Sequence, residues 1–367
     1  MYINNILYNY KGTVPENSTI TVNNGTVEIA ANAFKDQTGL FKVELPSTLT
    51  KIDNGAFYGC SNLKAVVSNA TSPSTLNYQE ERDANSPSVY ETSFGSISSN
   101  CILVVPSGKT SAYSSAGWTT SVFKGGIYET NSDIALTDGE AYTFPIDLAT
   151  NQITYTRTFG NTNWQALYVP FAMSYADWNT DFEVAEIKEI QGEGASTVVV
   201  VEEVTMSTEP NTPYLIKAKT SGSNKTITVN SATLKAAKEE GQVKEAGDYI
   251  FTFTGTYSGV SGSDMVANKY YALGGGTLHL AESESNNLGS FRWYLAITDT
   301  GGNPVTLDTN SVKMVMRGND GTLIDLVPEG AENEAKSGAY DLSGRKVETD
   351  KLERGIYIIN GKKVLVK

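Results

Sequence analysis

Apolar and polar residues alternate along several segments in the second half of the chain. The segment 291–297 (FRWYLAI) places its Phe, Trp, Leu and Ile on one face and its Arg and Tyr on the other. A period of two residues is typical of a strand with one buried face. Tyr249–Tyr257 has the same pattern. Further strands are expected at Ile153–Phe159, Trp164–Val169, Thr197–Val204, Pro213–Ala218 and Lys225–Val229.

These candidate strands predict how the middle of the chain folds. Asp138-Gly139 is a turn signal that opens the strand-rich region, and the period-two pattern continues to about residue 315. Two antiparallel sheets packed face to face bury such alternating faces most simply. We therefore expect residues 129–315 to form an antiparallel β-sandwich.

The first part of the chain contains an internal repeat. Val27–Phe41 (VEIAANAFKDQTGLF) and Thr50–Lys64 (TKIDNGAFYGCSNLK) align with apolar residues at equivalent positions, 23 residues apart. A fixed offset of this size is the sequence signature of a solenoid, in which each unit is one coil. The matching pairs are Ile29 and Ile52, Ala33 and Ala56, Phe34 and Phe57, Leu40 and Leu63, and Val43 and Val66.

Such coils have to stack on one another to be stable. About four buried large side chains contribute roughly 6–12 kcal/mol per coil, whereas ordering the backbone of about 23 residues costs roughly 23–46 kcal/mol. We therefore expect the coils to share one apolar interior, with Phe34 and Phe57 in equivalent inward positions.

The repeat carries recognisable motifs. Asn32-Ala33-Phe34, Leu45–Ile52 (LPSTLTKI) and Gly55–Leu63 (GAFYGCSNL) resemble the BspA-type leucine-rich repeats of surface proteins in Gram-negative gut and oral anaerobes. Gly39 and Gln37 depart mildly from the family pattern. A degraded third unit is expected at Ser93-Phe94, followed by Asn100–Gly108. The helix and Trp of Lys109–Trp118 resemble the family's terminal cap. The segment Ser68–Thr92, which contains Glu80–Asp83, is expected to be a solvated loop between coils.

Two further segments resemble parts of the same surface proteins. Thr154–Phe171 and Asn211–Ala218 resemble a module found downstream of such repeats, with no activity that we can assign. Near the C-terminus, Tyr340–Val347 and Gly355-Ile356-Tyr357 are similar to C-terminal sorting domains used for export to the cell surface. Asn360-Gly361 predicts a tight hairpin there. An ordinary small β-domain is the alternative.

These patterns together predict a mostly β protein of three domains. Residues 1–128 are expected to form a short leucine-rich-repeat solenoid with terminal caps, residues 129–315 the β-sandwich, and residues 316–367 a small C-terminal β-domain.

Charge and hydropathy narrow the classes of partner. The chain has 28 Lys and Arg against 41 Asp and Glu, a net charge of −13, which disfavours nucleic acid and anionic membranes. No apolar run approaches the roughly 20 residues of a membrane span. The opening MYINNILYNY lacks the features of an export signal, so we expect either a cytoplasmic protein or a leader that has been removed.

Few residues offer catalytic or metal-binding chemistry. His279 is the only histidine, and Gly259–Ser263 (GVSGS) lacks the final glycine of a nucleophile elbow. The carboxylates Glu183, Glu186, Glu189, Glu202 and Glu203 could include a glycosidase pair, although a solvated strand face is the simpler interpretation. We expect no enzymatic activity, no cofactor and no metal.

Three questions stay open at this level. Cys60 and Cys101 are either buried free thiols or a disulfide pair. Asn319-Asp320-Gly321 is either a turn or a calcium ligand set, and a turn fits better because the spacing of a calcium loop is missing. The four Trp either pack internally or form a sugar-stacking platform; they are Trp118, Trp164, Trp178 and Trp293.

A binding function is the leading hypothesis. The resemblance implies a secreted or cell-surface protein in adhesion or in protein or glycan binding, without membrane insertion. Its expected partner-binding residues are the outward strand positions Lys42, Glu44, Ala65 and Val67. The alternatives are a carbohydrate-binding or carbohydrate-degrading accessory protein and a structural spacer.

Overall fold

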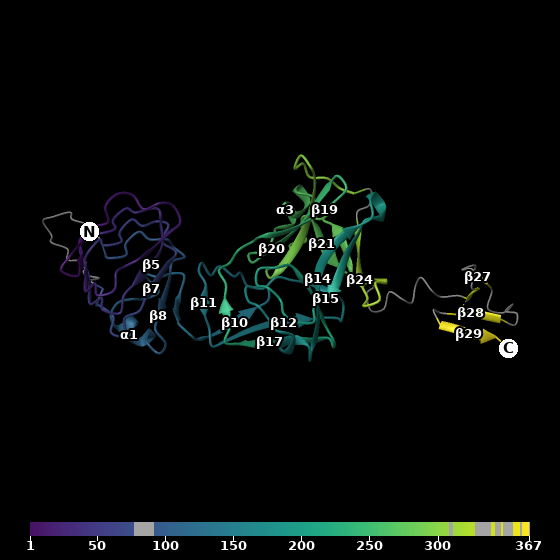
Figure 1. The fold of residues 1–367 in the computed structure, drawn as a ribbon, viewed down its shortest axis with the longest axis horizontal. Coiled ribbons are helices and arrows are strands. Elements are labelled where there is room, and N and C mark those ends of the chain that lie inside the picture. Colours follow the sequence, from purple (N-terminus) through teal and green to yellow (C-terminus); the bar gives the residue numbers. More distant parts are fainter. Residues whose placement is uncertain are drawn as a thin grey trace. The chain divides into compact units, whose positions relative to one another are not determined.

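The chain forms two compact units. The computed structural model describes residues 1–76, 92–307 and 311–326 and the backbone of four strands near the C-terminus (Figure 1). The predicted loop residues Glu80–Asp83 and the Asn360-Gly361 turn lie outside the described residues. The first unit contains Met1–Ile134, Phe144–Ile153 and Asn230–Ala236, and the second contains Ala135–Thr143, Thr154–Val229 and Ala237–Lys367. The division into three domains stays a prediction.

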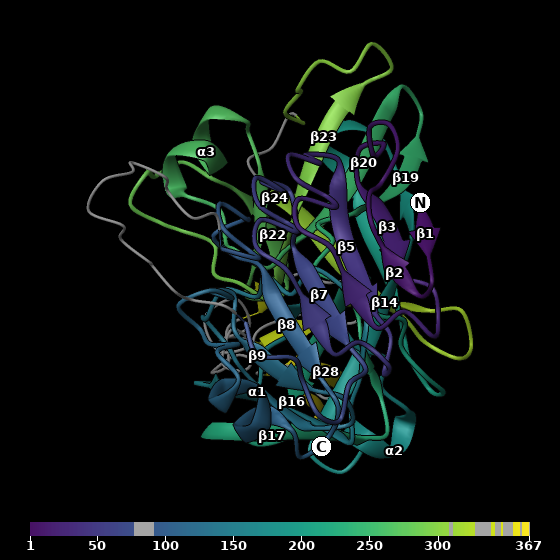
Figure 2. The same cartoon turned by 90° about the vertical axis from the view of Figure 1, so that its left-hand side faces the viewer.

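The first unit is a solenoid whose main sheet has five strands, all paired in parallel. Figure 2 shows β5, β7 and β8 of this sheet side by side. Parallel pairing of consecutive strands follows from the coil, because every turn of the solenoid enters the sheet in the same direction. The order is β3 (Ser18–Thr21), β5 (Leu40–Leu45), β7 (Ala65–Ser68), β8 (Ile102–Val105) and β9 (Ile127–Glu129).

A second, smaller sheet lies on another side of the coils. Its strands β2, β4 and β6 pair in parallel, with Leu7, Ile29 and Ile52 in register. β1 pairs with β2 at the edge of this sheet in the antiparallel direction. The four strands are β1 (Tyr2–Ile3), β2 (Ile6–Leu7), β4 (Glu28–Ile29) and β6 (Lys51–Ile52). The unit also contains the cap helix α1 (Thr110–Ser115) and a two-stranded ribbon of β11 (Leu148–Ala149) and β18 (Thr233–Leu234).

An aromatic stack runs through the interior of the solenoid. The rings of Phe34 and Phe57 are 5.0 Å apart with an interplanar angle of 7°, and those of Phe57 and Phe94 are 4.9 Å apart at 3°. Tyr10 continues the stack on the other side, 5.8 Å from Phe34. The equivalence of Phe34 and Phe57 is confirmed, and Tyr10 adds a coil that the repeat alignment did not include.

Backbone hydrogen bonds join each coil to the next at these aromatic residues. The amide of Tyr10 donates to Ala33 O at 2.9 Å, that of Phe34 to Ala56 O at 2.7 Å, and that of Phe57 to Ser93 O at 2.8 Å. The amide two residues later repeats this arrangement, because Asp36 donates to Tyr58 O and Gly59 donates to Gly95 O. A regular ladder therefore satisfies the backbone of the turns.

The second unit is built on one long, curled sheet. Hydrogen bonds join the strands in the order β13-β16-β14-β15-β24-β22-β21-β23-β20-β19, and β25 pairs with β24. All pairs are antiparallel except β15 with β24. Because β14 also contacts β19 and β13 contacts β21 and β23, the sheet curls over its own core. Two separate sheets of a sandwich are not confirmed.

The strands of this sheet agree with most of the predicted segments. They are β13 (Gln165–Leu167), β14 (Phe182–Gln191), β15 (Val198–Glu203), β16 (Tyr214–Ala218), β19 (Gly241–Ala246), β20 (Tyr249–Thr256), β21 (Tyr271–Gly274), β22 (Thr277–Leu280), β23 (Arg292–Asp299), β24 (Ser311–Arg317) and β25 (Leu323–Asp325). A three-stranded sheet contains β10 (Asp133–Thr137), β12 (Gln152–Phe159) and β17 (Gly222–Asn230). The helical elements are α2 (Tyr175–Trp178), η1 (Gly194–Ser196) and α3 (Gly262–Ala267).

One predicted position differs. Trp293, Leu295 and Ile297 are buried on one face of β23, but Phe291 precedes the strand with φ of 56°. Its ring packs 5.2 Å from Tyr155 and 5.7 Å from Tyr257. Phe291 is therefore buried in the core, but it does not lie on the face of β23 that Trp293, Leu295 and Ile297 share, where the alternation had predicted it.

Near the C-terminus, four short strands form an antiparallel sheet in the order β27-β26-β28-β29. The predicted hairpin strands β28 and β29 pair from Gly355 with Val366 to Ile359 with Lys362. The similarity to a sorting domain stays a prediction. The bounds are β26 (Ala339–Asp341), β27 (Lys346–Val347), β28 (Gly355–Ile359) and β29 (Lys362–Val366).

Candidate functional site

The predicted binding residues lie together on the outward face of the five-stranded sheet. Lys42 on β5 pairs in register with Ala65 on β7, and Glu44 pairs with Val67. Between them, Val43 and Val66 point into the core and are fully buried. The alternation of strand side chains therefore places the four residues in one small block.

The polar part of this block is held by its own contacts. Lys42 Nζ lies 2.7 Å from a Glu44 carboxylate oxygen, and the Thr21 hydroxyl donates to the other oxygen at 3.0 Å. The hydrogen bond from Lys42 is the main reason why the pKa of Glu44 is lowered. The pair presents a positive and a negative group side by side, which suits a polar partner better than a strongly charged one.

The apolar part of the block is only partly accessible. Val67 is half-buried, whereas Ala65 is fully buried, so Ala65 supplies no contact surface by itself. Ile102 and Val104 continue the two outward rows on β8 and are also buried. On β9 the Tyr128 ring packs edge-on against Phe144 at 4.7 Å. The binding role of the four residues stays a prediction, and Lys42, Glu44 and Val67 are its accessible members.

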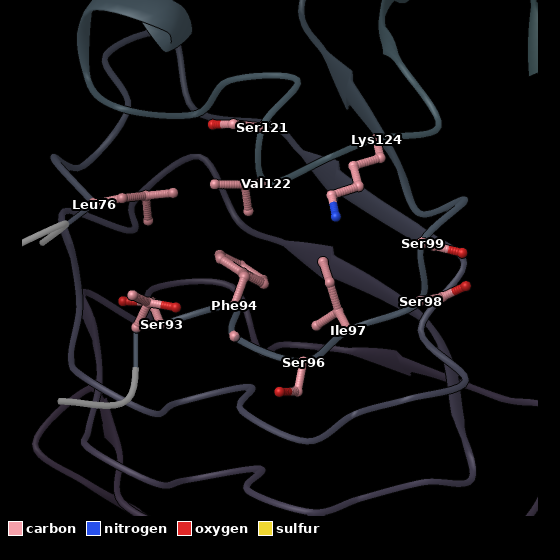
Figure 3. Close-up of a pocket in the computed structure, with 12 residues that line it drawn as sticks. Leu76, Ser93, Phe94, Ser96, Ile97, Ser98, Ser99, Ser121, Val122 and Lys124 are labelled. Carbon is pink, nitrogen blue, oxygen red and sulfur yellow. The ribbon is translucent and has the colours of Figure 1, made fainter. Parts of the chain in front are cut away.

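A pocket opens beside the coil of Phe94, which is the third coil of this unit when the coil of Phe34 is counted as the first. Figure 3 shows Leu76, Phe94, Ile97 and Val122 gathered around it, with the Lys124 amine directed towards Ile97. Its volume is about 250 Å³. Thr92, Gly95 and five serines complete the lining: Ser93, Ser96, Ser98, Ser99 and Ser121. The pocket thus combines an apolar centre, a hydroxyl-rich edge and one cation.

No motif or period in the sequence predicts this pocket. It depends on the third coil meeting the loop after α1, where Trp118 and Phe123 pack on Phe94 at 5.5 Å and 5.3 Å. A repeat alignment shows that the Phe94 coil exists, but it does not show what lies beyond it. The serine-rich stretch from Ser93 to Ser99 was the available signal.

Four of the five carboxylates considered for glycoside hydrolysis, all except Glu203, are paired with cations. Glu186 and Glu202 are opposite each other on β14 and β15, and Lys188 Nζ lies 2.6 Å from Glu186 and 3.5 Å from Glu202. Arg317 contacts both Glu202 and Glu189. This network supports the interpretation as a solvated strand face.

The other candidate motifs have structural roles. The Ser261 hydroxyl accepts from the Asp264 amide at the start of α3, so it is a helix cap. The Asp320 carboxylate accepts from the Thr322 amide and hydroxyl, which confirms the turn. His279 is exposed on β22, near Gly274 O. Among the described residues, no group of three or more His, Cys, Asp or Glu is placed to hold a metal ion.

The cysteines and tryptophans are mostly internal. Cys60 and Cys101 are buried free thiols, and burial raises the pKa of each to about 12. Trp118, Trp178 and Trp293 are at most 2% exposed, which removes a platform made of all four tryptophans. Trp164 is partly buried, with Lys217 Nζ 5.8 Å from its ring centre.

A buried charged cluster in the second unit has a structural role. The Asp138 carboxylate accepts from both terminal nitrogens of Arg292, at 2.5 and 2.7 Å, and from the Tyr155 hydroxyl at 2.7 Å. Arg157 is almost fully buried 3.8 Å from Asp138 and donates to Ala166 O. Burial opposes ionisation of Asp138, but the hydrogen bond from Arg292 and both positive charges hold its pKa below the ordinary value.

Comparisons with known proteins agree with the repeat. Residues 8–101 match the family described as BspA type Leucine rich repeat region, in 6 copies. A search of curated proteins found no match, and a search of solved structures found none. Among the described residues, no helix is both long and apolar enough to cross a membrane.

Proposed function

Because residues 8–101 are a BspA-type leucine-rich-repeat region, we propose that this chain is a non-catalytic protein of the bacterial cell surface that binds a protein or glycan partner. The observation that carries the proposal is the row of in-register outward residues on the parallel sheet, where Lys42, Glu44 and Val67 remain accessible. Because the backbone of a sheet is already ordered, binding at these side chains avoids the cost of ordering a loop.

The dimensions of the sheet limit the kind of partner. Five strands spaced about 4.8 Å apart give a face roughly 19 Å wide. This is wider than two or three strands would give. With strands of 3 to 6 residues, roughly 10–20 Å long, the face covers about 200–400 Å², less than the roughly 800 Å² that each side of a standard protein interface buries. Burial of Ala65, Ile102 and Val104 reduces it further. The partner is therefore a short glycan or peptide segment, or a protein that also touches neighbouring surfaces of the unit.

Two measurements test the proposal. The full chain is applied to an array of glycans and host extracellular proteins, and retention on defined members is expected. In the native bacterium, an amine-reactive label that cannot cross membranes is expected to modify the chain on intact cells. Retention on no member of the array would favour a structural spacer, and labelling only after cell lysis would contradict the surface location.

A further inference from the structure

The hydrogen-bond ladder between coils ends at the pocket beside Phe94. In the two preceding coils, the amides of Phe34 and Asp36, and then those of Phe57 and Gly59, donate to carbonyls of the following coil. The equivalent donors of the third coil are the amides of Phe94 and Ser96. Among the residues that the structure describes, neither amide donates to a backbone carbonyl.

The third coil keeps the geometry of the earlier ones at this point. Asp36, Gly59 and Ser96 occupy equivalent positions and share a positive φ, at 58°, 74° and 54°. The amides of Phe94 and Ser96 are therefore expected to point away from the second coil, as their equivalents do. Both residues line the pocket.

The amides of Phe94 and Ser96 match a backbone that offers two carbonyls two residues apart. Ser93 O and Gly95 O, which accept from the equivalent donors of the second coil, have this spacing and lie in a turn. Alternate carbonyls of an extended peptide point in the same direction, so a bound peptide could occupy the place of the missing acceptors.

The rest of the lining adds two requirements. Leu76, Phe94, Ile97 and Val122 favour an apolar side chain. Lys124, the only charged residue among the described residues of the lining, favours a carboxylate. The volume of about 250 Å³ lies below the roughly 300–1,000 Å³ of pockets for drug-sized ligands. One side chain fits such a space better than a whole oligosaccharide or cofactor.

We propose that this pocket binds the C-terminal residue of an extended peptide. Backbone carbonyls of the peptide accept from the amides of Phe94 and Ser96, its last side chain is apolar and fills the centre, and its terminal carboxylate pairs with Lys124. This site is separate from Lys42, Glu44 and Val67, so the proposal does not depend on the function assigned to the sheet.

Amide-resolved NMR of the full chain tests the proposal. The probes are N-acetyl-Ala-Ala-Leu with a free carboxylate, the same peptide as a C-terminal amide, N-acetyl-Ala-Ala-Gly, and hexanoate. The free-acid Leu peptide is expected to shift the Phe94 and Ser96 amide signals saturably. The amidated peptide and the Lys124→Ala variant are expected to bind about two- to fivefold more weakly, the factor that an exposed ion pair contributes.

Controls separate this site from general effects. Lys11→Ala removes an exposed lysine that does not line the pocket, and it should leave binding unchanged. The Gly peptide should bind more weakly than the Leu peptide. The proposal is overturned if the Phe94 and Ser96 signals do not move up to the solubility limit of the Leu peptide, if acid and amide bind equally, or if hexanoate binds as well as the peptide. The last result would identify a site for short fatty acids.

Discussion

The rings of Phe34 and Phe57 stack 5.0 Å apart and almost parallel, although the two residues are 23 positions apart in the chain. Each is at most 1% exposed. The stack links coils that are not stable alone, since the apolar face of each coil is covered by its neighbours.

Truncating the central ring should therefore destabilise the whole solenoid. We expect Phe57→Ala to lower the free energy of unfolding by about 3–5 kcal/mol, the usual cost of removing a buried Phe side chain. Urea unfolding followed by circular dichroism measures this. Tyr8→Ala, at a side chain that is 41% exposed, should cost much less. Equal losses in the two variants would argue against the stack.

Glu129 predicts a pH-dependent contribution to stability. Its carboxylate accepts from the Gly108 amide and from the Thr110 amide and hydroxyl, and the Thr110 bonds come first among the causes that lower its pKa to about 2. A lowered folded-state pKa means that the contribution is complete above the unfolded value of about 4.3 and is lost as the pH falls towards 2.

The matching variant is Glu129→Gln. We expect it to lower stability by about 1 kcal/mol near pH 7, as loss of a helix cap does, and to differ little from the parent near pH 2. Melting temperatures across this range provide the measurement, with the exposed Glu16→Gln as control. A constant difference between parent and Glu129→Gln at every pH would refute the role of ionisation.

The thiols of Cys60 and Cys101 should be inert in the folded protein. Both are buried, and a pKa of about 12 leaves almost no thiolate near pH 8. We expect Ellman's reagent to react slowly with the native chain and to detect both thiols at once in denaturant. Rapid reaction of the native chain, or a disulfide found by mass spectrometry, would contradict the structure.

Asp138 should be important for the stability of the second unit. Asp138→Asn removes the negative charge beside Arg292 and the almost fully buried Arg157, so we expect a loss of about 3–5 kcal/mol. Thermal unfolding of the variant measures the loss. Asp248→Asn, at an exposed turn between β19 and β20, is the matched control and should change little. A melting curve of Asp138→Asn that overlays the parent curve would show that the cluster is dispensable.

Local sequence patterns predicted the elements better than their long-range pairing. The offset between Phe34 and Phe57 predicted the coils, because equivalent residues of a solenoid repeat at a fixed interval. Tyr10 escaped the alignment because it is not Phe and lies 24 residues before Phe34. The single curled sheet was not predicted, since the parallel pairing of β15 with β24 joins residues more than 100 positions apart.

For the candidate sites too, the sequence predicted local side-chain positions but not the long-range contacts around them. The alternation of strand side chains placed Lys42, Glu44 and Val67 on one face, but the burial of Ala65 depends on what covers that face. The pocket beside Phe94 depends on where the chain returns after α1, which no period in the sequence encodes.

The central claim is that the outward face of the five-stranded sheet is the binding surface. The most direct test is the affinity of a partner retained on the array for the parent chain, for Val67→Asp and for Lys11→Glu as control. A charge at Val67 should weaken binding at least about tenfold, equivalent to about 1.4 kcal/mol, while Lys11→Glu should leave it unchanged. Equal affinities for the parent and Val67→Asp would contradict the account.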